Sequence, residues 1–209
     1  MIIDKLVKIY FSPTLSTENI VHSIAKGWNV SEQRTISLNS LEQRHNVKFN
    51  IEPSEAVILG IPVYEERIPD LLYPVLTKVR GSRNPMILVV TYGNISAGIA
   101  LKQLSKMMKN QGFKIIAAAS FIGEHSFSHE EIKIASGRPD SKDMEMAILL
   151  GKQVSQKIEN TEKIENFPEL NIKGELRAMR KLLPRHSELA FAHSPVIDSN
   201  LCKKCKKCL

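Results

Sequence analysis

The chain has 209 residues, of which 43% are hydrophobic and 24% charged, and its formal charge is +7. This composition excludes collagen-like, low-complexity and wholly disordered proteins. No apolar run approaches the roughly 20 residues of a membrane helix, and the N-terminus does not resemble a signal peptide, so a cytoplasmic location without membrane contact is expected. The excess of Lys and Arg permits binding to nucleic acid, but no basic helix face stands out and no such partner is expected.

The first 160 residues alternate strands with helices. Apolar residues at helical spacing predict helices over residues 17–28, 68–80, 97–110 and 142–159. Strand-like runs precede or separate them, at residues 6–11, 34–38, 56–61, 86–91 and 114–122. The third and fourth runs are uninterrupted and apolar, as in strands covered on both faces. This order predicts a three-layer α/β sandwich built on a five-stranded parallel sheet.

The loop after the first strand is rich in hydroxyl groups. Ligands of open parallel sheets bind at the carboxyl ends of strands. The helix that follows this loop supplies free N–H groups and a partial positive charge, which suit a phosphate. The loop contains no Gly or Lys and is neither a Walker loop nor a dinucleotide fingerprint. The alternative is that its hydroxyls only cap the helix. They belong to Ser12, Thr14, Ser16 and Thr17.

Two further strand ends carry a tyrosine among turn-forming residues. Because parallel strands end at one edge of the sheet, these loops can enclose a flat ring while their backbone amides meet its polar rim. The alternative is that each is an ordinary strand-to-helix turn. The candidate ring-binding residues are Pro62, Val63, Tyr64 and Glu65 after the third strand, and Thr91, Tyr92, Gly93 and Asn94 after the fourth.

These motifs resemble those of flavodoxins. The hydroxyl loop is similar to the flavodoxin phosphate loop, and residues 62–64 and 92–94 occupy the places of the two flavin-ring loops. The likeness covers residues 1–160. More narrowly, residues 121–126, 137–140 and 194–196 are similar to those of fusions that carry a bacterial 4Fe–4S ferredoxin, and the chain resembles their flavodoxin-like domain.

The resemblance implies the strand order 2-1-3-4-5 and a noncovalently bound FMN, with the Leu15 N–H among the phosphate donors. An electron carrier serving redox partner proteins, without catalytic residues, is expected ahead of a substrate-converting enzyme. The alternatives are a flavin-dependent NAD(P)H or quinone reductase and a cofactor-free interaction module with the same fold.

Glu65 and Glu66 depart from the family pattern, because related sequences commonly have small residues there, often Gly-Gly. Glycine lets a backbone carbonyl reorient toward the flavin, since positive φ costs it little. Two glutamates hinder that movement and add negative charge near the ring. They predict a lowered flavin reduction potential or a less stable neutral semiquinone.

All three cysteines lie within the last eight residues. Cys202, Cys205 and Cys208 have the spacing that opens the bacterial ferredoxin run, whose thiolates hold a 4Fe–4S cluster. The chain given stops at Leu209, before the next cysteine of that run. Residues 201–209 are therefore interpreted as an incomplete ferredoxin motif that holds no stable cluster alone, as a cluster site completed by a non-cysteine or partner ligand, or as a zinc site. Residues 161–200, which include a short expected helix at 174–183, are interpreted as a linker.

Two histidines, His125 and His129, follow the fifth strand beside Glu124 and Glu130. This grouping suggests a metal or acid–base site, although loop histidines are more commonly solvated or hydrogen-bonded structure. The loop lies near the expected flavin edge, so both can approach a bound ligand. The single tryptophan, Trp28, is expected in the core.

Overall fold

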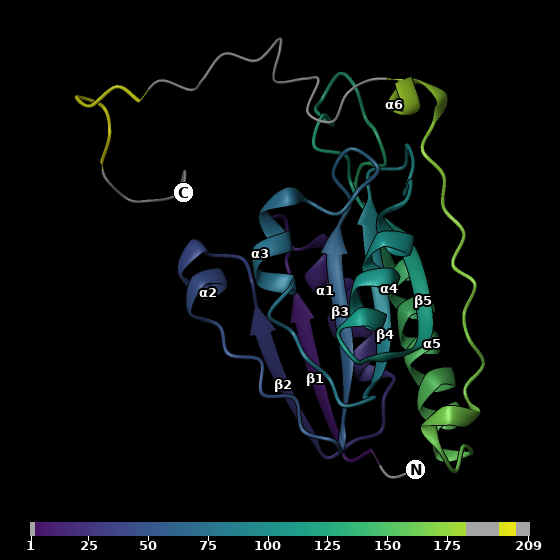
Figure 1. The fold of residues 1–209 in the computed structure, drawn as a ribbon. Coiled ribbons are helices and arrows are strands. Elements are labelled where there is room, and N and C mark those ends of the chain that lie inside the picture. Colours follow the sequence, from purple (N-terminus) through teal and green to yellow (C-terminus); the bar gives the residue numbers. More distant parts are fainter. Residues whose placement is uncertain (1–2, 183–196, 204–209) are drawn as a thin grey trace. The chain divides into compact units, whose positions relative to one another are not determined.

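The structure, a computed structural model, describes residues 3–182 and 197–203. The chain divides into two compact units, Met1–Glu175 and Leu176–Leu209. The first contains a five-stranded sheet of order β2-β1-β3-β4-β5, in which all neighbouring strands are parallel (Figure 1). The predicted fold class and strand order are thereby confirmed. The strands are β1 (Lys5–Tyr10), β2 (Glu32–Ser37), β3 (Glu55–Pro62), β4 (Pro85–Tyr92) and β5 (Lys114–Ile122).

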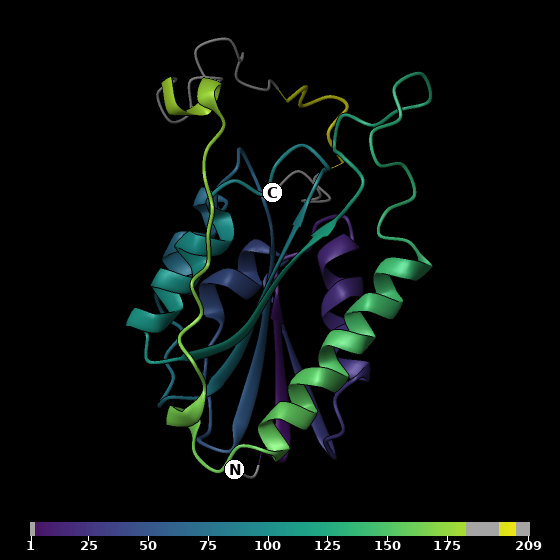
Figure 2. The same ribbon diagram turned by 90° about the vertical axis from the view of Figure 1, so that its right-hand side faces the viewer.

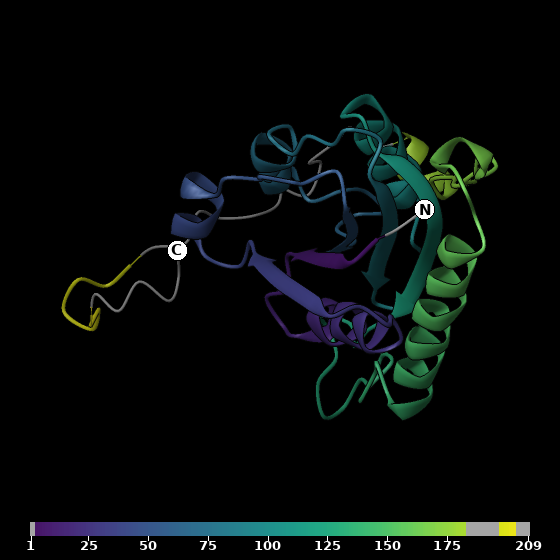
Figure 3. The ribbon, with the colours of Figure 1, turned by 90° about the horizontal axis from the view of Figure 1, so that it is seen from below.

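Helices cover both faces of the sheet (Figures 2 and 3). One face packs against α1 (Ser16–Lys26) and α5 (Ser141–Glu159), and the other against α3 (Tyr73–Leu76) and α4 (Ala100–Asn110). Successive residues of β3 enter the two cores alternately, because side chains alternate along a strand. Burial on both faces explains why β3 and β4 are almost entirely apolar.

Helices α1 and α5 approach each other at two glycines. A Cβ atom at Gly151 would lie 2.0 Å from the carbonyl oxygen of Ile24, and one at Gly27 would lie 2.1 Å from that of Ile148. Both contacts are with backbone, so only glycine fits without moving a helix. Trp28, which follows α1, is buried in the core as expected.

The predicted helix over residues 68–80 is wrong. The segment contains a 3-10 turn, η1 (Asp70–Leu72), and the single α-helical turn of α3. Pro74 explains the interruption, because it has no N–H to donate to the carbonyl of Asp70 and its ring would clash in a helix interior.

Sequence reasoning also missed a short helix, α2 (Leu41–Asn46). Its capping box was readable: Ser40 accepts from the Gln43 N–H, and the Gln43 side chain accepts from the Ser40 N–H.

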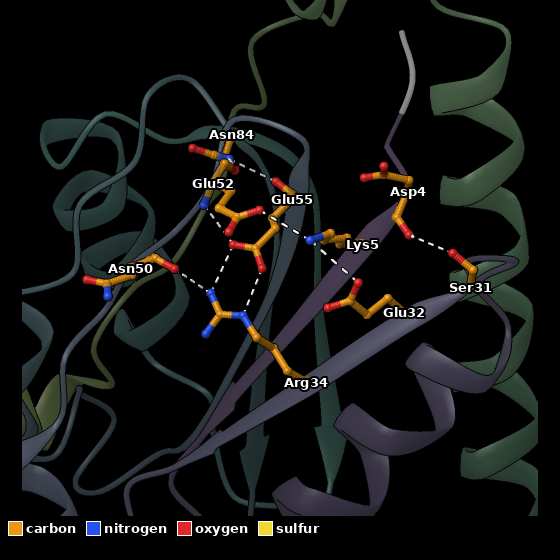
Figure 4. A network of polar contacts seen from close by, with 9 residues as sticks. All are labelled: Asp4, Lys5, Ser31, Glu32, Arg34, Asn50, Glu52, Glu55 and Asn84. Carbon is orange, nitrogen blue, oxygen red and sulfur yellow. Dashed lines mark hydrogen bonds and ion pairs between the residues drawn. The ribbon is translucent and has the colours of Figure 1, made fainter.

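At the amino end of the sheet, a polar network fixes the start of β3 (Figure 4). The Glu55 side chain is 3% exposed and accepts two hydrogen bonds from Arg34, at 2.7 Å from Nε and 2.9 Å from Nη2. Burial raises the pKa of Glu55, but hydrogen bonds from Arg34 and from the Glu52 backbone N–H outweigh it and leave the pKa lowered. Nearby, the buried Asn84 amide donates to the carbonyls of Glu52 and Glu55.

After α5, residues 160–175 form a strap that runs back beside α4 and β5 toward the carboxyl edge of the sheet (Figure 1). The Glu169 carboxylate lies 2.7 Å from the ammonium groups of both Lys109 and Lys114. These hydrogen bonds, that of Lys109 foremost, lower the pKa of Glu169 to about 2. Further along, a Cβ at Gly174 would lie 2.7 Å from the carbonyl oxygen of Gly98. The compact unit thus extends past residue 160, where the linker was expected to begin.

The second unit contains α6 (Ala178–Leu182) and a turn before the first cysteine. The backbone N–H groups of Leu201 and Cys202 both donate to the carbonyl of Asp198, at 3.2 and 3.0 Å. Cys202 is half-buried, whereas the predicted ligands Cys205 and Cys208 lie outside the described residues. Across residues 3–182 and 197–203, no group of three or more metal-binding side chains is found. In the same ranges, no helix has the length and apolarity needed to cross a membrane.

Candidate functional site

The loop between β1 and α1 is held in shape by Ser12. This residue is 2% exposed; its hydroxyl accepts from the Glu18 N–H at 3.0 Å, and its own N–H donates to Asn39 Oδ1 at 2.6 Å. Leu15 takes a left-handed conformation (φ 65°), and its N–H donates to the Ser12 carbonyl at 3.4 Å. Both residues were predicted to contact a phosphate, and in the structure both form hydrogen bonds that shape the loop.

Three backbone N–H groups of this loop have no hydrogen-bond acceptor among the described residues. These are the N–H groups of Thr14, Ser16 and Thr17. Ser16 and Thr17 begin α1, whose first amides have no partner within the helix and carry its partial positive charge. The three donors and the hydroxyls of Thr14 and Ser16 are suited to an anion.

The Thr17 hydroxyl has another role. Its Oγ1 lies 2.6 Å from Thr91 Oγ1 in a buried hydrogen bond that joins the start of α1 to β4. Gly60 in β3 permits this approach, since a Cβ there would lie 2.9 Å from Thr17 Cγ2. Thr17 and Thr91 therefore fix the position of the loop and leave Thr14 and Ser16 as its available hydroxyls.

After β3, residues Tyr64 to Arg67 form a tight turn in which the end residues exchange backbone hydrogen bonds of 3.1 and 2.8 Å. Glu65 (φ 50°) and Glu66 (φ 64°) both lie in the left-handed region, as the central residues of a type I′ turn do. This conformation favours glycine. Tyr64 is 44% exposed beside the turn, and burial of the rest of its side chain raises its pKa.

The loops after β4 and β5 meet at Gly93. The Gly123 N–H donates to the carbonyl of Tyr92 at 2.9 Å, and the imidazole of His125 lies against Gly93. Asn94 has a positive φ (59°), and its N–H returns to the Tyr92 carbonyl. The β5 loop thereby closes one side of the candidate ring site.

These loops enclose two neighbouring pockets at the carboxyl edge of the sheet. The first, of about 150 Å³, brings together most of the residues predicted from the first three loops. The second, of about 410 Å³, shares Thr14 and Ser16 with it and extends toward Arg138. The first pocket is lined by Pro13, Thr14, Ser16, Thr17, Pro62, Val63, Tyr64, Thr91, Tyr92 and Gly93, together with Gly123, Glu124, His125 and Ser126.

The last four lining residues, Gly123 to Ser126, were missing from the predicted site. The signal was available, since β5 lies next to β4 in the predicted order and its loop must reach the same edge. Of the other predicted residues, Leu15 lines the second pocket, whereas Ser12, Glu65 and Asn94 line neither.

Two charged side chains lie at the pockets. Among the described residues, no Lys or Arg lines the first pocket, and Arg138, the only one lining the second, is engaged by the Asp143 carboxylate, while Glu124 lines both. That hydrogen bond raises the pKa of Arg138 and lowers that of Asp143. The exposed Glu124 carboxylate accepts from the Gly137 N–H, which lowers its pKa. An anion here would be held by neutral hydroxyls and amides.

Comparison with solved structures places the chain in the flavodoxin-like fold. A flavodoxin from the domain Archaea is 16% identical, with a TM-score of 0.52; the match covers 74% of this chain and 99% of the other. A structure described as a flavone reductase is 10% identical with a TM-score of 0.56, covering 79% and 66%. The Flv1 flavodiiron core from Synechocystis sp. PCC6803 is 13% identical with a TM-score of 0.51, covering 76% of this chain but 36% of its own.

At these identities the likeness establishes the fold alone. The chain spans about a third of the flavodiiron core and just under two thirds of the flavone reductase. No protein-family model matches the sequence, and no curated protein is similar to it.

Proposed function

We propose that residues 1–175 bind FMN noncovalently and that the protein carries electrons. The observation that carries this proposal is that the N–H groups of Thr14, Ser16 and Thr17 have no acceptor in the part of the chain that the structure describes and lie next to a pocket bounded by Tyr64 and Tyr92. A phosphate monoester fits the amides and hydroxyls, and a flat ring fits the space beside the tyrosines. FMN combines the two groups.

The residues present fit this cofactor by their chemistry. Thr14 and Ser16 would hold the phosphate through backbone and side chain, and Thr17 through its backbone N–H. Tyr64 and Tyr92 would lie beside the ring, with Gly93 at its polar edge. Bound FMN supplies one- and two-electron redox chemistry, while the protein binds it, orients it and tunes its potential.

Titration of the apoprotein with FMN, followed by quenching of flavin fluorescence, tests the proposal. Replacing Thr14 and Ser16 together by Ala removes two hydroxyl donors to a charged group. A charge-assisted hydrogen bond contributes about 1.5–3 kcal/mol, so we expect FMN affinity to fall about tenfold to a hundredfold for each bond lost, and more than a hundredfold when both are lost. Thr35→Ala, which removes an exposed hydroxyl on β2, is the matched control and should bind as the wild type does.

Titration with riboflavin, which lacks the phosphate, is a second test of the phosphate site. The wild type should bind FMN more tightly than riboflavin, and the double variant should reduce that preference. Equal affinity of the wild type for the two would contradict the phosphate site. Absence of binding to either would favour a cofactor-free interaction module.

A flavin-dependent reductase is the second candidate. The observation that favours it is the second pocket, of about 410 Å³, which adjoins the first and has room for another small molecule. Rapid bleaching of protein-bound FMN by NADPH, without a partner reductase, would support this activity over carriage of electrons between proteins.

We propose that the C-terminal cysteines belong to an iron–sulfur module that exchanges electrons with the flavin. The support is their spacing in the sequence. Iron and acid-labile sulfide should be retained after anaerobic reconstitution in the presence of a fourth ligand. Retention of zinc alone would contradict the assignment.

A further inference from the structure

His125 stands out among the histidines because it lines both pockets. We infer that His125 contacts bound FMN and presents to it a hydrogen-bond donor, the Nε2–H of a neutral imidazole held in one orientation. This inference rests on the proposed FMN site and adds a residue that was not among the predicted cofactor contacts.

Two contacts with Phe127 fix the tautomer and orientation of the His125 ring. The Phe127 backbone N–H donates to His125 Nδ1 at 3.0 Å. Because Nδ1 accepts, the single proton of the neutral imidazole is on Nε2, which is then a donor. The two rings also touch, with centroids 5.0 Å apart and planes inclined by 49°.

The backbone of His125 is held as well. Its N–H donates to the carbonyl of Ile134 at 3.1 Å, and its carbonyl accepts from the Ser128 N–H at 2.8 Å. A ligand-binding side chain costs less entropy on binding when its position is fixed beforehand. The loop therefore presents the imidazole at little further cost.

Gly93 provides the space that the imidazole occupies. A Cβ at position 93 would lie 2.4 Å from His125 Cδ2, the ring carbon bonded to Nε2. Even alanine would displace the ring. The absence of a side chain at 93 thus lets the Cγ–Cδ2 edge of the imidazole lie against the loop predicted to meet the polar rim of the flavin.

The surroundings leave an oxygen acceptor as the partner that His125 lacks. The other residues that line both pockets are Thr14, Ser16, Glu124 and Ser126, and the backbone N–H groups of Thr14 and Ser16 are themselves donors. The nearest carboxylate in sequence, Glu124, accepts from Gly137, and no hydrogen bond from Nε2 occurs within residues 3–182 or 197–203. FMN offers oxygens on its ring, its ribityl chain and its phosphate.

Fluorescence titrations with three variants test the inference. His125→Leu removes the donor, and we expect FMN affinity to fall about fivefold to tenfold, the effect of one hydrogen bond of about 1 kcal/mol or slightly more. His125→Gln keeps an N–H donor of similar reach and should recover most of that loss. His129→Leu changes an exposed histidine of the same loop that lines neither pocket, and its affinity should equal that of the wild type.

Riboflavin locates the acceptor. A loss with both ligands places the contact on the ring or ribityl chain, and a loss with FMN alone places it on the phosphate; either supports the inference. Long-range ¹H–¹⁵N spectra give a readout independent of binding strength. They should show the Nε2–H tautomer of His125 at neutral pH and a shift of this nitrogen when FMN is added.

Three results would overturn the inference: His125→Leu binding as tightly as the wild type, His125→Gln losing as much as His125→Leu, or an Nδ1–H tautomer. Far-UV circular dichroism of each variant checks that the fold is retained. If the wild type itself binds no flavin, the proposed function fails; if the wild type binds and only these comparisons fail, the inference alone is lost.

Discussion

The turn after β3 leads to a quantitative prediction, because Glu65 adopts φ 50° without being glycine. A left-handed conformation costs an L-residue about 1–2 kcal/mol. Glycine avoids this cost, but it gives the unfolded chain more conformational entropy, which lowers the free energy of unfolding by about 0.4–1 kcal/mol. The balance predicts that Glu65→Gly is more stable than Glu65→Ala by about 1 kcal/mol.

Alanine is the informative comparison, because Glu65→Ala removes the carboxylate and keeps the Cβ. Its difference from Glu65→Gly therefore reports the backbone alone. The assay is chemical denaturation of the apoproteins, with thermal unfolding as a check. For a domain of this size, 1 kcal/mol corresponds to about 2–4 °C in Tm. A Glu65→Gly variant no more stable than Glu65→Ala would refute the reasoning.

The same pair separates the two causes expected to lower the flavin potential. If the carboxylate charge lowers it, both variants should raise the midpoint potential of the FMN-loaded protein. If the stiff turn lowers it, only Glu65→Gly should do so. Unchanged potentials in both variants would count against any influence of Glu65 on the flavin.

Three further predictions concern the scaffold. Arg34→Met leaves the buried Glu55 carboxylate without its charged partner and should destabilise the protein by about 2–3 kcal/mol at pH 7. Because the pKa of Glu55 is lowered in the fold, this stabilisation is present above the ordinary Glu pKa of 4.5 and is lost as the pH falls, so urea denaturation curves of variant and wild type should converge in acid. Gly151→Ala should lower the free energy of unfolding by about 2 kcal/mol or more, because its Cβ would meet the Ile24 carbonyl oxygen at 2.0 Å. A free energy of unfolding within about 0.5 kcal/mol of the wild-type value, roughly the measurement scatter, would show that α1 and α5 can separate freely. Glu169→Gln should speed hydrogen exchange in the strap at pH 7 and leave β3 and β4 protected, whereas unchanged exchange would mean that apolar contacts alone hold it.

The sequence pattern was most informative where burial dominates. Strands covered on both faces must be apolar throughout, so β3 and β4 were found within a residue or two. Local exceptions were harder to foresee. Pro74 interrupts the helix expected from the apolar spacing, and the positive φ of Gly98 (53°) delays the start of α4 to Ala100.

For the site, the hydroxyl-rich loop was correctly located at the edge of the sheet, but the tasks of its side chains were not readable. Ser12 and Thr17 look equivalent to Thr14 and Ser16 in the sequence. Only the folded chain shows that the Ser12 hydroxyl accepts from the Glu18 N–H, while the Ser12 backbone N–H donates to Asn39, and that the Thr17 hydroxyl bonds to Thr91. Asn39 and Thr91 lie far from Ser12 and Thr17 along the chain, so periodicity carries no information on such partners. The β5 loop, by contrast, could have been included, because the predicted strand order already placed it at the same edge.

A crystal structure of the protein with FMN tests the central claim most directly. We predict phosphate oxygens within hydrogen-bond distance of the backbone nitrogens of Thr14, Ser16 and Thr17, and the ring beside Tyr64 and Tyr92. A phosphate bound elsewhere, for instance on surface lysines, with these three amides facing water, would contradict the account.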